Sequence, residues 1–268
     1  MCLIFFFSSL NQETPEPPEA NVAQHQITDE YPNKKRILQE LDILQAIKGN
    51  KNVIGFYGAF YHPASVKMPE REGLWISMER WSGVTVQDLI KTRRSLSEDW
   101  IAYICREVLQ GLCHLHKQEV IHHDLRPQNI IVTSSADVKI SNSATMGTSS
   151  VSTSGTIPYM APEVLSNIST KTIRYNSKAD IWSLGISALE MAEGYYRKSD
   201  NFRAFIREIL QKNVAWRPSA EQLLSHPFIS NIPNERGTIS IYCSYSYNIL
   251  GLSYIYYNSI TKAAHNKG

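Results

Sequence analysis

Cysteine is scarce in this sequence, and the few cysteines form no metal-binding pattern. Among 268 residues there are four, Cys2, Cys105, Cys113 and Cys243, and no two of them make a C-x-x-C pair, which argues against a zinc site. Cys105 and Cys113 fall on one predicted helix, too far apart along it to form a disulfide. This usage predicts a reducing intracellular compartment, and we expect the cytoplasm.

Strong net charge and long hydrophobic runs are also lacking. The formal net charge is +2, so nothing favours nucleic acid or an acidic membrane as the main partner. No segment makes a convincing membrane span. Met1–Phe7 is apolar, but it has no basic flank and is short for a signal sequence. We interpret it as a frayed or artefactual N-terminus, with a secretory signal as the alternative.

Glycine is missing from the first 33 residues. Pro15, Pro17 and Pro18 stand there among acidic residues, so residues 1–32 are predicted to form an extended, disordered leader.

At the C-terminal end, residues 237–268 are β-prone, apolar and almost uncharged, with no helical period. Exposed segments of that kind aggregate, and nothing in the sequence places this tail in a domain.

Between these ends, the first elements are predicted to be a helix, two strands and a short helix. Apolar residues recur at helical spacing over residues 33–47, and Gly49 stands where a helix-ending glycine would lie. Val53–Phe60 and Leu74–Met78 are predicted strands, separated by a proline-containing loop. Val84–Thr92 is a predicted short helix.

The second half of the chain is predicted to be mainly helical. Its elements are a long amphipathic helix capped by Ser97, a hairpin of strands Ile130–Val132 and Val138–Ile140, a polar loop at Ser141–Ser154, and helices at Asp180–Met191, Phe202–Leu210 and from Ser219. Asp180–Met191 is apolar nearly all round, which predicts a helix buried in the centre of the domain. Gln222 completes a capping box with Ser219. Few early strands followed by many helices indicate an α+β fold with two lobes.

One stretch carries chemistry. His122, His123 and Asp124 follow two apolar residues, and Asn129 follows Asp124 by five residues, ahead of a β-branched run. Protein kinases use this spacing, H-R-D-x-x-x-x-N, to bring a carboxylate to an incoming hydroxyl and an amide oxygen to a metal on the nucleotide phosphates. A tight loop would place Asp124 and Asn129 side by side. The alternative, an acidic surface loop before a buried strand, explains the tripeptide but not its surroundings.

Further motifs follow in the order found in kinases. They are Tyr57-Gly-Ala-Phe60, Glu98 to Glu107 (EDWIAYICRE), Gly155-Thr156, Met160-Ala-Pro-Glu163, Asp180-Ile-Trp-Ser183, Glu190-Met-Ala-Glu-Gly194, and Arg217-Pro-Ser219 with His226-Pro-Phe228. Through them the chain resembles the Ste20-type serine/threonine protein kinases, in the germinal-centre branch that includes the Misshapen/Nck-interacting group. The resemblance runs from about Gln39 to Arg236.

The resemblance implies a two-lobed, protein-kinase-like α+β fold over residues 33–236. An N-lobe remnant would occupy residues 33–78, a hinge residues 79–83 and a mainly helical C-lobe residues 84–236. The implied activity is phosphoryl transfer from ATP to protein serine or threonine, with ATP and magnesium as cofactors. The implied partners are proteins of a kinase signalling pathway.

Individual residues take their expected roles from the family. Asp124 matches the catalytic base, Asn129 matches the metal-binding asparagine, and Arg126 replaces a lysine near the transferred phosphate. Glu40 matches the glutamate of the family's αC helix.

Other matches concern the nucleotide and the scaffold. Met78 takes the gatekeeper position, and Glu79 to Trp81 form the hinge whose backbone would meet an adenine. Glu163 is expected to pair with Arg217. Asp180 is expected to hold the backbone of the catalytic loop.

The chain departs from the family at two functional places. Before the αC helix the family has a glycine-rich loop and a strand that ends in a lysine, and no such sequence precedes residue 33, so we expect an incomplete N-lobe and no ion-pair partner for Glu40. Asn142 replaces the aspartate that holds magnesium. Its amide oxygen could bind a metal, but it brings no negative charge to a hard dication. Ser143 and Ala144 replace the phenylalanine and glycine that follow that aspartate.

Smaller departures point the same way. His123 stands where the family has an arginine that steadies the activation loop, and an imidazole is a weaker and pH-dependent replacement. Ile157 disturbs the Gly-Thr-Pro-Tyr pattern. Between Gly194 and Phe202 there is no room for the region that helps the family receive substrate.

Three functional hypotheses follow. The first is a pseudokinase-like scaffold or regulator without competent phosphoryl transfer, and it is the one we favour for the folded part. The second is an active serine/threonine kinase, supported by Asp124, Asn129 and the Ala-Pro-Glu motif. The third is a truncated product of a degenerating kinase gene, without a function of its own.

Overall fold

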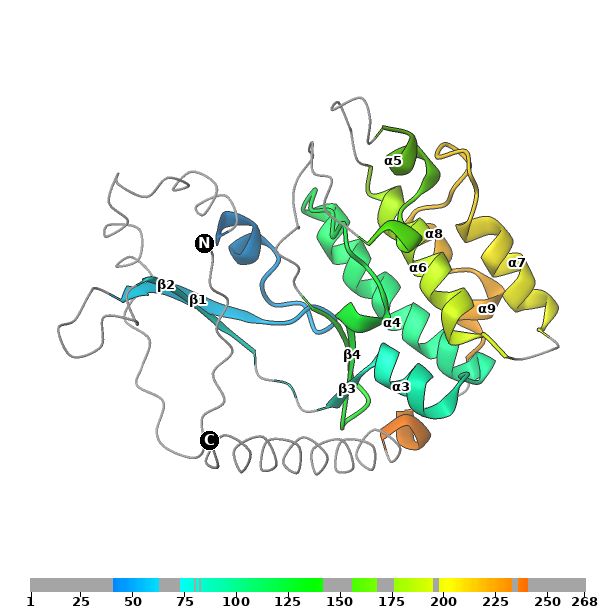
Figure 1. Cartoon of the computed structure of the whole chain (residues 1–268), viewed down its shortest axis with the longest axis horizontal. Coiled ribbons are helices and arrows are strands. Elements are labelled where there is room, and N and C mark those ends of the chain that lie inside the picture. The colour runs from blue at the N-terminus through cyan, green and yellow to red at the C-terminus, as the bar shows by residue number, and fades with distance from the viewer. Residues whose placement is uncertain are drawn as a thin grey trace, which may run out of the picture. The chain divides into compact units, whose positions relative to one another are not determined.

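The chain forms two compact units, of which one contains Met1–Asn50 and Ile54–Arg80 and the other Lys51–Val53 and Trp81–Gly268 (Figure 1). The structure is a computed structural model, and it describes residues 41–62, 73–79, 81, 83–141, 156–167, 176–194, 198–232 and 236–240. Among these described residues, each unit contains one antiparallel sheet.

The first unit contains an antiparallel hairpin of strands β1 (Phe56–His62) and β2 (Gly73–Met78). Residues 41–46 are helical, and Gly49 has φ +89°, the left-handed conformation predicted for a residue after a helix end. The part of this predicted helix before residue 41 lies outside the described residues. β2 confirms its prediction, but β1 begins three residues later than expected. Directly before β1 and after β2, Gly55 and Glu79 are bonded to each other: Gly55 N donates to Glu79 Oε2 (2.9 Å) and Glu79 N to Gly55 O (2.7 Å).

The second unit contains a three-stranded antiparallel sheet in the order β3–β4–β5, formed by Gly83–Thr85, Ile130–Thr133 and Val138–Ile140. The predicted β4–β5 hairpin is confirmed, with Ile131 paired to Lys139. The prediction of a helix from Val84 was wrong at its start, because Val84 and Thr85 pair with β4. Helix α3 (Val86–Arg93) follows, and Thr85 and Asp88 form its capping box.

Close packing of β3 on β4 requires Gly83. A Cβ atom at this position would lie 2.6 Å from Thr133 Cα and closer still to the Val132 carbonyl oxygen. We expect Gly83→Ala to lower the free energy of unfolding by about 1–3 kcal/mol, because backbone atoms of β4 would have to move. Gly58→Ala is the matched control, since a Cβ atom there meets nothing within 4 Å. Equal denaturation midpoints for the two variants would contradict this account of the β3–β4 contact.

Helices make up most of the second unit (Figure 1). They are α4 (Glu98–Lys117), α5 (Pro162–Asn167), α6 (Lys178–Met191), α7 (Asp200–Ile209), α8 (Ala220–Leu223) and α9 (Pro227–Ser230), with the 3-10 turns η2 (Pro127–Asn129) and η3 (Ile157–Tyr159). Ser97 caps α4 as predicted, and its hydroxyl accepts from Trp100 N at 3.4 Å. The predicted capping box of Ser219 and Gln222 begins α8.

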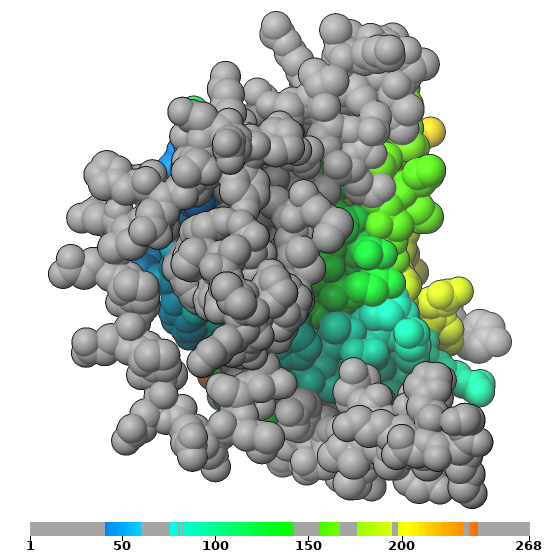
Figure 2. All heavy atoms as spheres, turned by 60° about the vertical axis from the view of Figure 1, so that its left-hand side comes forward, coloured from blue at the N-terminus to red at the C-terminus, as the bar shows by residue number. Residues whose placement is uncertain are grey.

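The helices pack with their apolar faces inward, as the predicted spacing requires. The α4 stripe is completely buried at Ile101, Ile104, Cys105, Val108, Leu109, Leu112 and Leu115. The polar end of α3, residues 91–94, is exposed and lies at the surface in the space-filling view (cyan in Figure 2). The prediction that α6 is a buried helix is confirmed for most of its residues, and the side chain of Leu189 is the exception at 42% exposed.

The fold continues a few residues past the predicted end of the domain. Residues 236–240 are helical, although the sequence shows no helical period there, and Ile239 is completely buried. Ser240 Oγ donates to Ser134 O at 2.6 Å, and Arg236 pairs with Asp137 at 2.5 Å, so this segment packs against the turn between β4 and β5. The division into leader, kinase-like domain and tail stays a prediction.

Glu107 on α4 anchors the segment Lys51–Val53 of the second unit. Its Oε2 accepts from Asn52 Nδ2 (3.0 Å) and from Lys51 Nζ (3.1 Å), and Asn52 Nδ2 also donates to Val138 O (3.0 Å). Burial acts to raise the pKa of the Glu107 carboxyl, but the hydrogen bonds from Asn52 and Lys51 outweigh it and lower this pKa.

This lowered pKa predicts a pH dependence of stability. A carboxylate whose pKa is lower in the folded state stabilises that state above its unfolded pKa, and the contribution is lost as the pH falls through the folded value. We therefore expect the wild type to exceed Glu107→Gln in free energy of unfolding above pH 4.5, the ordinary glutamate value, and the difference to shrink below it. Glu221→Gln, at an exposed carboxylate, serves as the control. A difference that does not change with pH would contradict the assignment.

Candidate active site

Asp180 on α6 fixes the backbone of the predicted catalytic loop, as the resemblance implied. Its Oδ2 accepts from His122 N (3.0 Å) and its Oδ1 from His123 N (3.1 Å), while His116 Nε2 lies 2.9 Å from Oδ2. Burial acts to raise the pKa of this carboxyl, but the hydrogen bond and charge of His116 lower it overall. The loop bends sharply here, since His123 has φ +66°.

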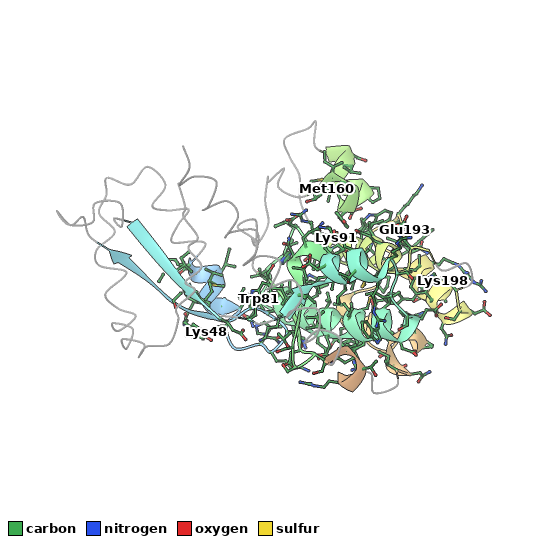
Figure 3. The ribbon with its side chains drawn as sticks, turned by 60° about the horizontal axis from the view of Figure 1, so that its bottom comes forward. Lys48, Trp81, Lys91, Met160, Glu193 and Lys198 are labelled. Atoms are coloured by element: carbon green, nitrogen blue, oxygen red, sulfur yellow. The ribbon has the colours of Figure 1, made fainter. Side chains whose placement is uncertain are left out.

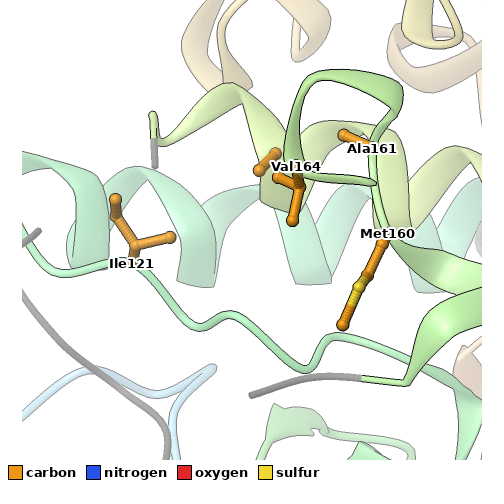
Figure 4. Close-up of a cluster of buried hydrophobic side chains, with 5 residues drawn as sticks. Ile121, Met160, Ala161 and Val164 are labelled. Atoms are coloured by element: carbon orange, nitrogen blue, oxygen red, sulfur yellow. The ribbon is translucent and has the colours of Figure 1, made fainter. Parts of the chain in front are cut away.

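A small hydrophobic cluster supports the same loop from its other side. Ile121, directly before His122, belongs to a buried group with Met160, Ala161, Val164 and Ala179 (Figure 4). These residues come from the catalytic loop, from α5 and the segment before it, and from α6. The cluster therefore ties the predicted catalytic loop to the Met-Ala-Pro-Glu segment.

The structure brings Asp124, Asn129 and Arg126 together. Asn129 Nδ2 donates to Asp124 Oδ2 at 2.9 Å and to the Asp124 carbonyl oxygen at 2.7 Å. Arg126 Nε lies 3.4 Å from Asp124 Oδ2. The side-by-side arrangement of Asp124 and Asn129 is as the spacing predicted, because the 3-10 turn η2 carries Asn129 back toward Asp124.

The other oxygen of Asp124 accepts from Thr156, a residue of the Gly155-Thr156 motif whose contact with Asp124 was not predicted. Thr156 donates to Asp124 Oδ1 twice, from its hydroxyl at 2.9 Å and from its backbone N–H at 3.2 Å. Oδ1 thus accepts two hydrogen bonds within the chain, and Oδ2 accepts one from Asn129 and lies beside Arg126.

The 3-10 turn η3, which follows Thr156, is held by α6. Ser183 Oγ donates to the Tyr159 carbonyl oxygen at 2.8 Å, and the Tyr159 hydroxyl donates to Glu190 Oε2 at 2.5 Å. Burial, followed by the hydrogen bond to Glu190, raises the pKa of the Tyr159 phenol. Because α6 also carries Asp180, one helix positions both the catalytic loop and the segment that follows Thr156.

Ser141 places the start of the predicted metal segment beside Asn129. Ser141 N donates to the Asn129 carbonyl oxygen at 2.9 Å, and His122 Nε2 lies 2.8 Å from Ser141 O. Asn142, the residue expected to replace a metal-binding aspartate, comes next and lies outside the described residues.

The remaining predicted site residues are scattered over the two units. Met78 ends β2 in the first unit, where the backbone N–H of Glu79 is used by Gly55, and Trp81 is a partly buried residue of the second unit. Glu40 lies outside the described residues. Their predicted contact with a nucleotide stays a prediction.

Of the two positions at which the family binds magnesium, the structure describes Asn129. Its Nδ2 is bonded to Asp124, and its side-chain oxygen is a possible metal ligand. Among the described residues, no three His, Cys, Asp or Glu side chains gather as a metal-binding group.

Within the part of the chain that the structure describes, no helix has the length and apolar character needed to cross a membrane.

Comparison with known proteins identifies the class. A family model described as "Protein kinase domain" matches residues 20–197, and the chain belongs to this family. The mixed α/β structure with a helical majority agrees with that assignment.

The similar proteins are Ste20 kinases of the germinal-centre branch, so the chain is a Ste20-like serine/threonine protein kinase domain. It is 37% identical to the human Nik-related protein kinase over 235 residues, which is 75% of this chain and 15% of that protein. It is 36% identical over 232 residues to the Caenorhabditis elegans serine/threonine-protein kinase mig-15, covering 74% of this chain and 21% of the relative. The rat Misshapen-like kinase 1 is 35% identical over 237 residues, covering 76% and 18%. The chain thus spans about a fifth or less of the length of these relatives.

Proposed function

We propose that this Ste20-like kinase domain is impaired in phosphoryl transfer and acts as a scaffold or regulator that binds proteins of a kinase signalling pathway. The predicted cytoplasmic location belongs to this proposal. The observation that carries it is Asn142, a neutral amide at the position where the family has a magnesium-binding aspartate.

The packing of Ser141 supports this interpretation of Asn142. Ser141, the residue before Asn142 in the sequence, is bonded to the backbone of Asn129, the other residue expected to bind the metal. An aspartate at position 142 would add a negative charge to the metal site, and asparagine does not. Metal assistance contributes several kcal/mol to a transition state of this kind, and we expect most of that contribution to be lost.

The hydrogen bonds of Asp124 are compatible with phosphoryl transfer. A general base must accept a hydrogen bond from the hydroxyl that it deprotonates. Oδ1 accepts two hydrogen bonds from Thr156 and Oδ2 accepts one from Asn129. A carboxylate oxygen has two acceptor positions, so Oδ2 can still accept from a substrate hydroxyl.

An active kinase is the second candidate, and the geometry of Asp124 and Asn129 favours it. The two side chains touch, and Arg126 puts a positive charge beside them, as phosphoryl transfer would require. An acidic residue from elsewhere in the chain could then supply the missing charge at the metal.

Measurement of turnover separates the two candidates. The full chain and its Asp124→Ala variant would be incubated with magnesium, labelled ATP and a general protein substrate, and incorporated phosphate would be counted. The proposal predicts equal incorporation by both proteins, at the level of a blank. Incorporation by the wild type that Asp124→Ala abolishes would establish the active kinase instead. An insoluble full chain would favour the third hypothesis, a product without a function of its own.

A further inference from the structure

One face of α6 remains partly open, whereas most of the other side chains of this helix are buried. Ile181, Leu184, Ala188 and Met191 are all 0% exposed. Trp182 and Ile186 are partly buried and Leu189 is 42% exposed. Their spacing of four and three residues puts these last three on one face of the helix, which we call the α6 stripe.

The α6 stripe has opposite charges at its two ends. Lys178 lies four residues before Trp182, and Glu193, labelled in Figure 3, lies four residues after Leu189. Lys178 begins α6, and Glu193 lies in the turn two residues after the helix ends at Met191. Glu193 is exposed, and the Nζ atom of Lys178 donates to Val214 O at 3.2 Å, which keeps the amine at this end of the stripe. From Lys178 to Met191 the helix runs about 20 Å at the rise of an α-helix.

Two further large apolar side chains of the same unit are exposed. Trp216 is 74% exposed, and its backbone N–H donates to Asn213 O at 3.1 Å. It precedes Arg217, whose guanidinium lies 5.1 Å from the centroid of the Trp182 ring. Ile157, 67% exposed, lies on η3, which Ser183 and Glu190 bind to α6. Exposed tryptophan is typical of protein-binding surfaces.

We propose that the α6 stripe is the docking surface for a second copy of this chain, with the two α6 helices antiparallel about a two-fold axis near Ile186. In that arrangement Lys178 lies beside Glu193 of the partner subunit, and Trp182 packs against Leu189 of the partner subunit. A two-fold contact needs a surface that is complementary to itself. A stripe with a lysine at one end, a glutamate at the other and apolar residues between them meets this requirement.

Charge reversal tests the arrangement. Lys178→Glu places two acidic residues together at both ends of the pair, and Glu193→Lys places two lysines together there. We expect each variant alone to self-associate at least about tenfold more weakly than the wild type, measured by analytical ultracentrifugation of the full chain.

A mixture of the two variants provides the decisive comparison. In a mixed dimer both ends again join a lysine to a glutamate, so an equimolar mixture should associate about as strongly as the wild type. This recovery requires two folded proteins, so misfolding of either variant cannot imitate it. A wild-type chain that stays monomeric at high-micromolar concentration would overturn the proposal. So would single variants that associate as strongly as the wild type, since another surface or another partner would then be responsible.

A cross-link tests the position of the axis. A disulfide forms when the Cα atoms come within about 4.4–6.8 Å, which two residues on a two-fold axis can satisfy. Ile186→Cys should give a disulfide-linked dimer on mild oxidation. Asn201→Cys, at an exposed site on α7, is the matched control, and the wild type gives the background from its own cysteines. Equal cross-linking of Ile186→Cys and the control would contradict this axis. None of these readouts depends on phosphoryl transfer, so they do not fail or succeed with the proposed function.

Discussion

Replacing Glu163 with glutamine is expected to lower the free energy of unfolding by about 3 kcal/mol, because it leaves the buried charge of Arg217 without its counter-ion. Arg217 is completely buried. Its Nη1 and Nη2 donate to Glu163 Oε1 (2.8 Å) and Oε2 (3.0 Å), so the pair is bidentate, as the resemblance had led us to expect. Nη1 also donates to Lys178 O and Nε to Gln211 O. One guanidinium therefore joins α5, α6 and the loop after α7.

An exposed ion pair of the same chain provides the control for this prediction. Lys117 and Glu221 lie 3.8 Å apart, and their side chains are 68% and 76% exposed. Exposed pairs contribute about 0–1 kcal/mol, so Glu221→Gln should change the denaturation midpoint little. If Glu163→Gln were no more destabilising than Glu221→Gln, the Glu163–Arg217 pair would not be the link that we describe.

The second large effect is expected at the metal position. Asn142→Asp restores the carboxylate that the family places there, and we expect it to strengthen ATP binding in the presence of magnesium by about tenfold to a hundredfold. In the absence of magnesium the affinities of the two proteins should be similar, because the added carboxylate acts through the metal. Isothermal titration of both proteins, with magnesium and with a chelator, measures the difference.

Two variants control for indirect effects of this substitution. Asn142→Ser changes the side chain without adding charge and should behave as the wild type does. Asn142→Asp combined with Asp124→Ala should keep much of the gain in binding, since the introduced carboxylate rather than the base position would carry it. Equal affinities for wild type and Asn142→Asp in magnesium would mean that Asn142 does not explain any loss of metal binding.

The parts of the fold that the sequence predicted well have local causes. Ser97 and the Ser219–Gln222 box begin helices through hydrogen bonds within one turn. The β4–β5 hairpin closes over a turn of a few residues, and Ala136 there takes a left-handed conformation with φ +63°. Such signals can be found without knowledge of the rest of the molecule.

The predictions that were wrong depended on distant partners. Val84 and Thr85 are β-branched residues before a helix, and only their pairing with Val132 and Ile131 makes them a strand. The helix α6 is buried as predicted, but the exposure of Leu189 within it likewise depends on which elements cover the helix.

The candidate site shows the same difference between local contacts, which the sequence predicted, and distant contacts, which it did not. Asp124 and Asn129 are five residues apart, so a single turn determines their contact, and the motif predicted it. Thr156 is 32 residues from Asp124 and stands at the end of a serine- and threonine-rich stretch. The Gly155-Thr156 motif distinguishes it from the other hydroxyl residues there, but no local signal indicates that it contacts Asp124, and this contact was found only in the structure.

The central claim, an impaired metal site, is tested most directly by thermal unfolding of the wild-type chain with millimolar ATP, with and without magnesium. A ligand that binds only the folded state raises the melting temperature by mass action. The account predicts no stabilisation that depends on magnesium, whether or not ATP alone stabilises the protein. A rise in melting temperature that requires magnesium and disappears in Asp124→Ala would contradict it, because the metal site would then be intact despite Asn142.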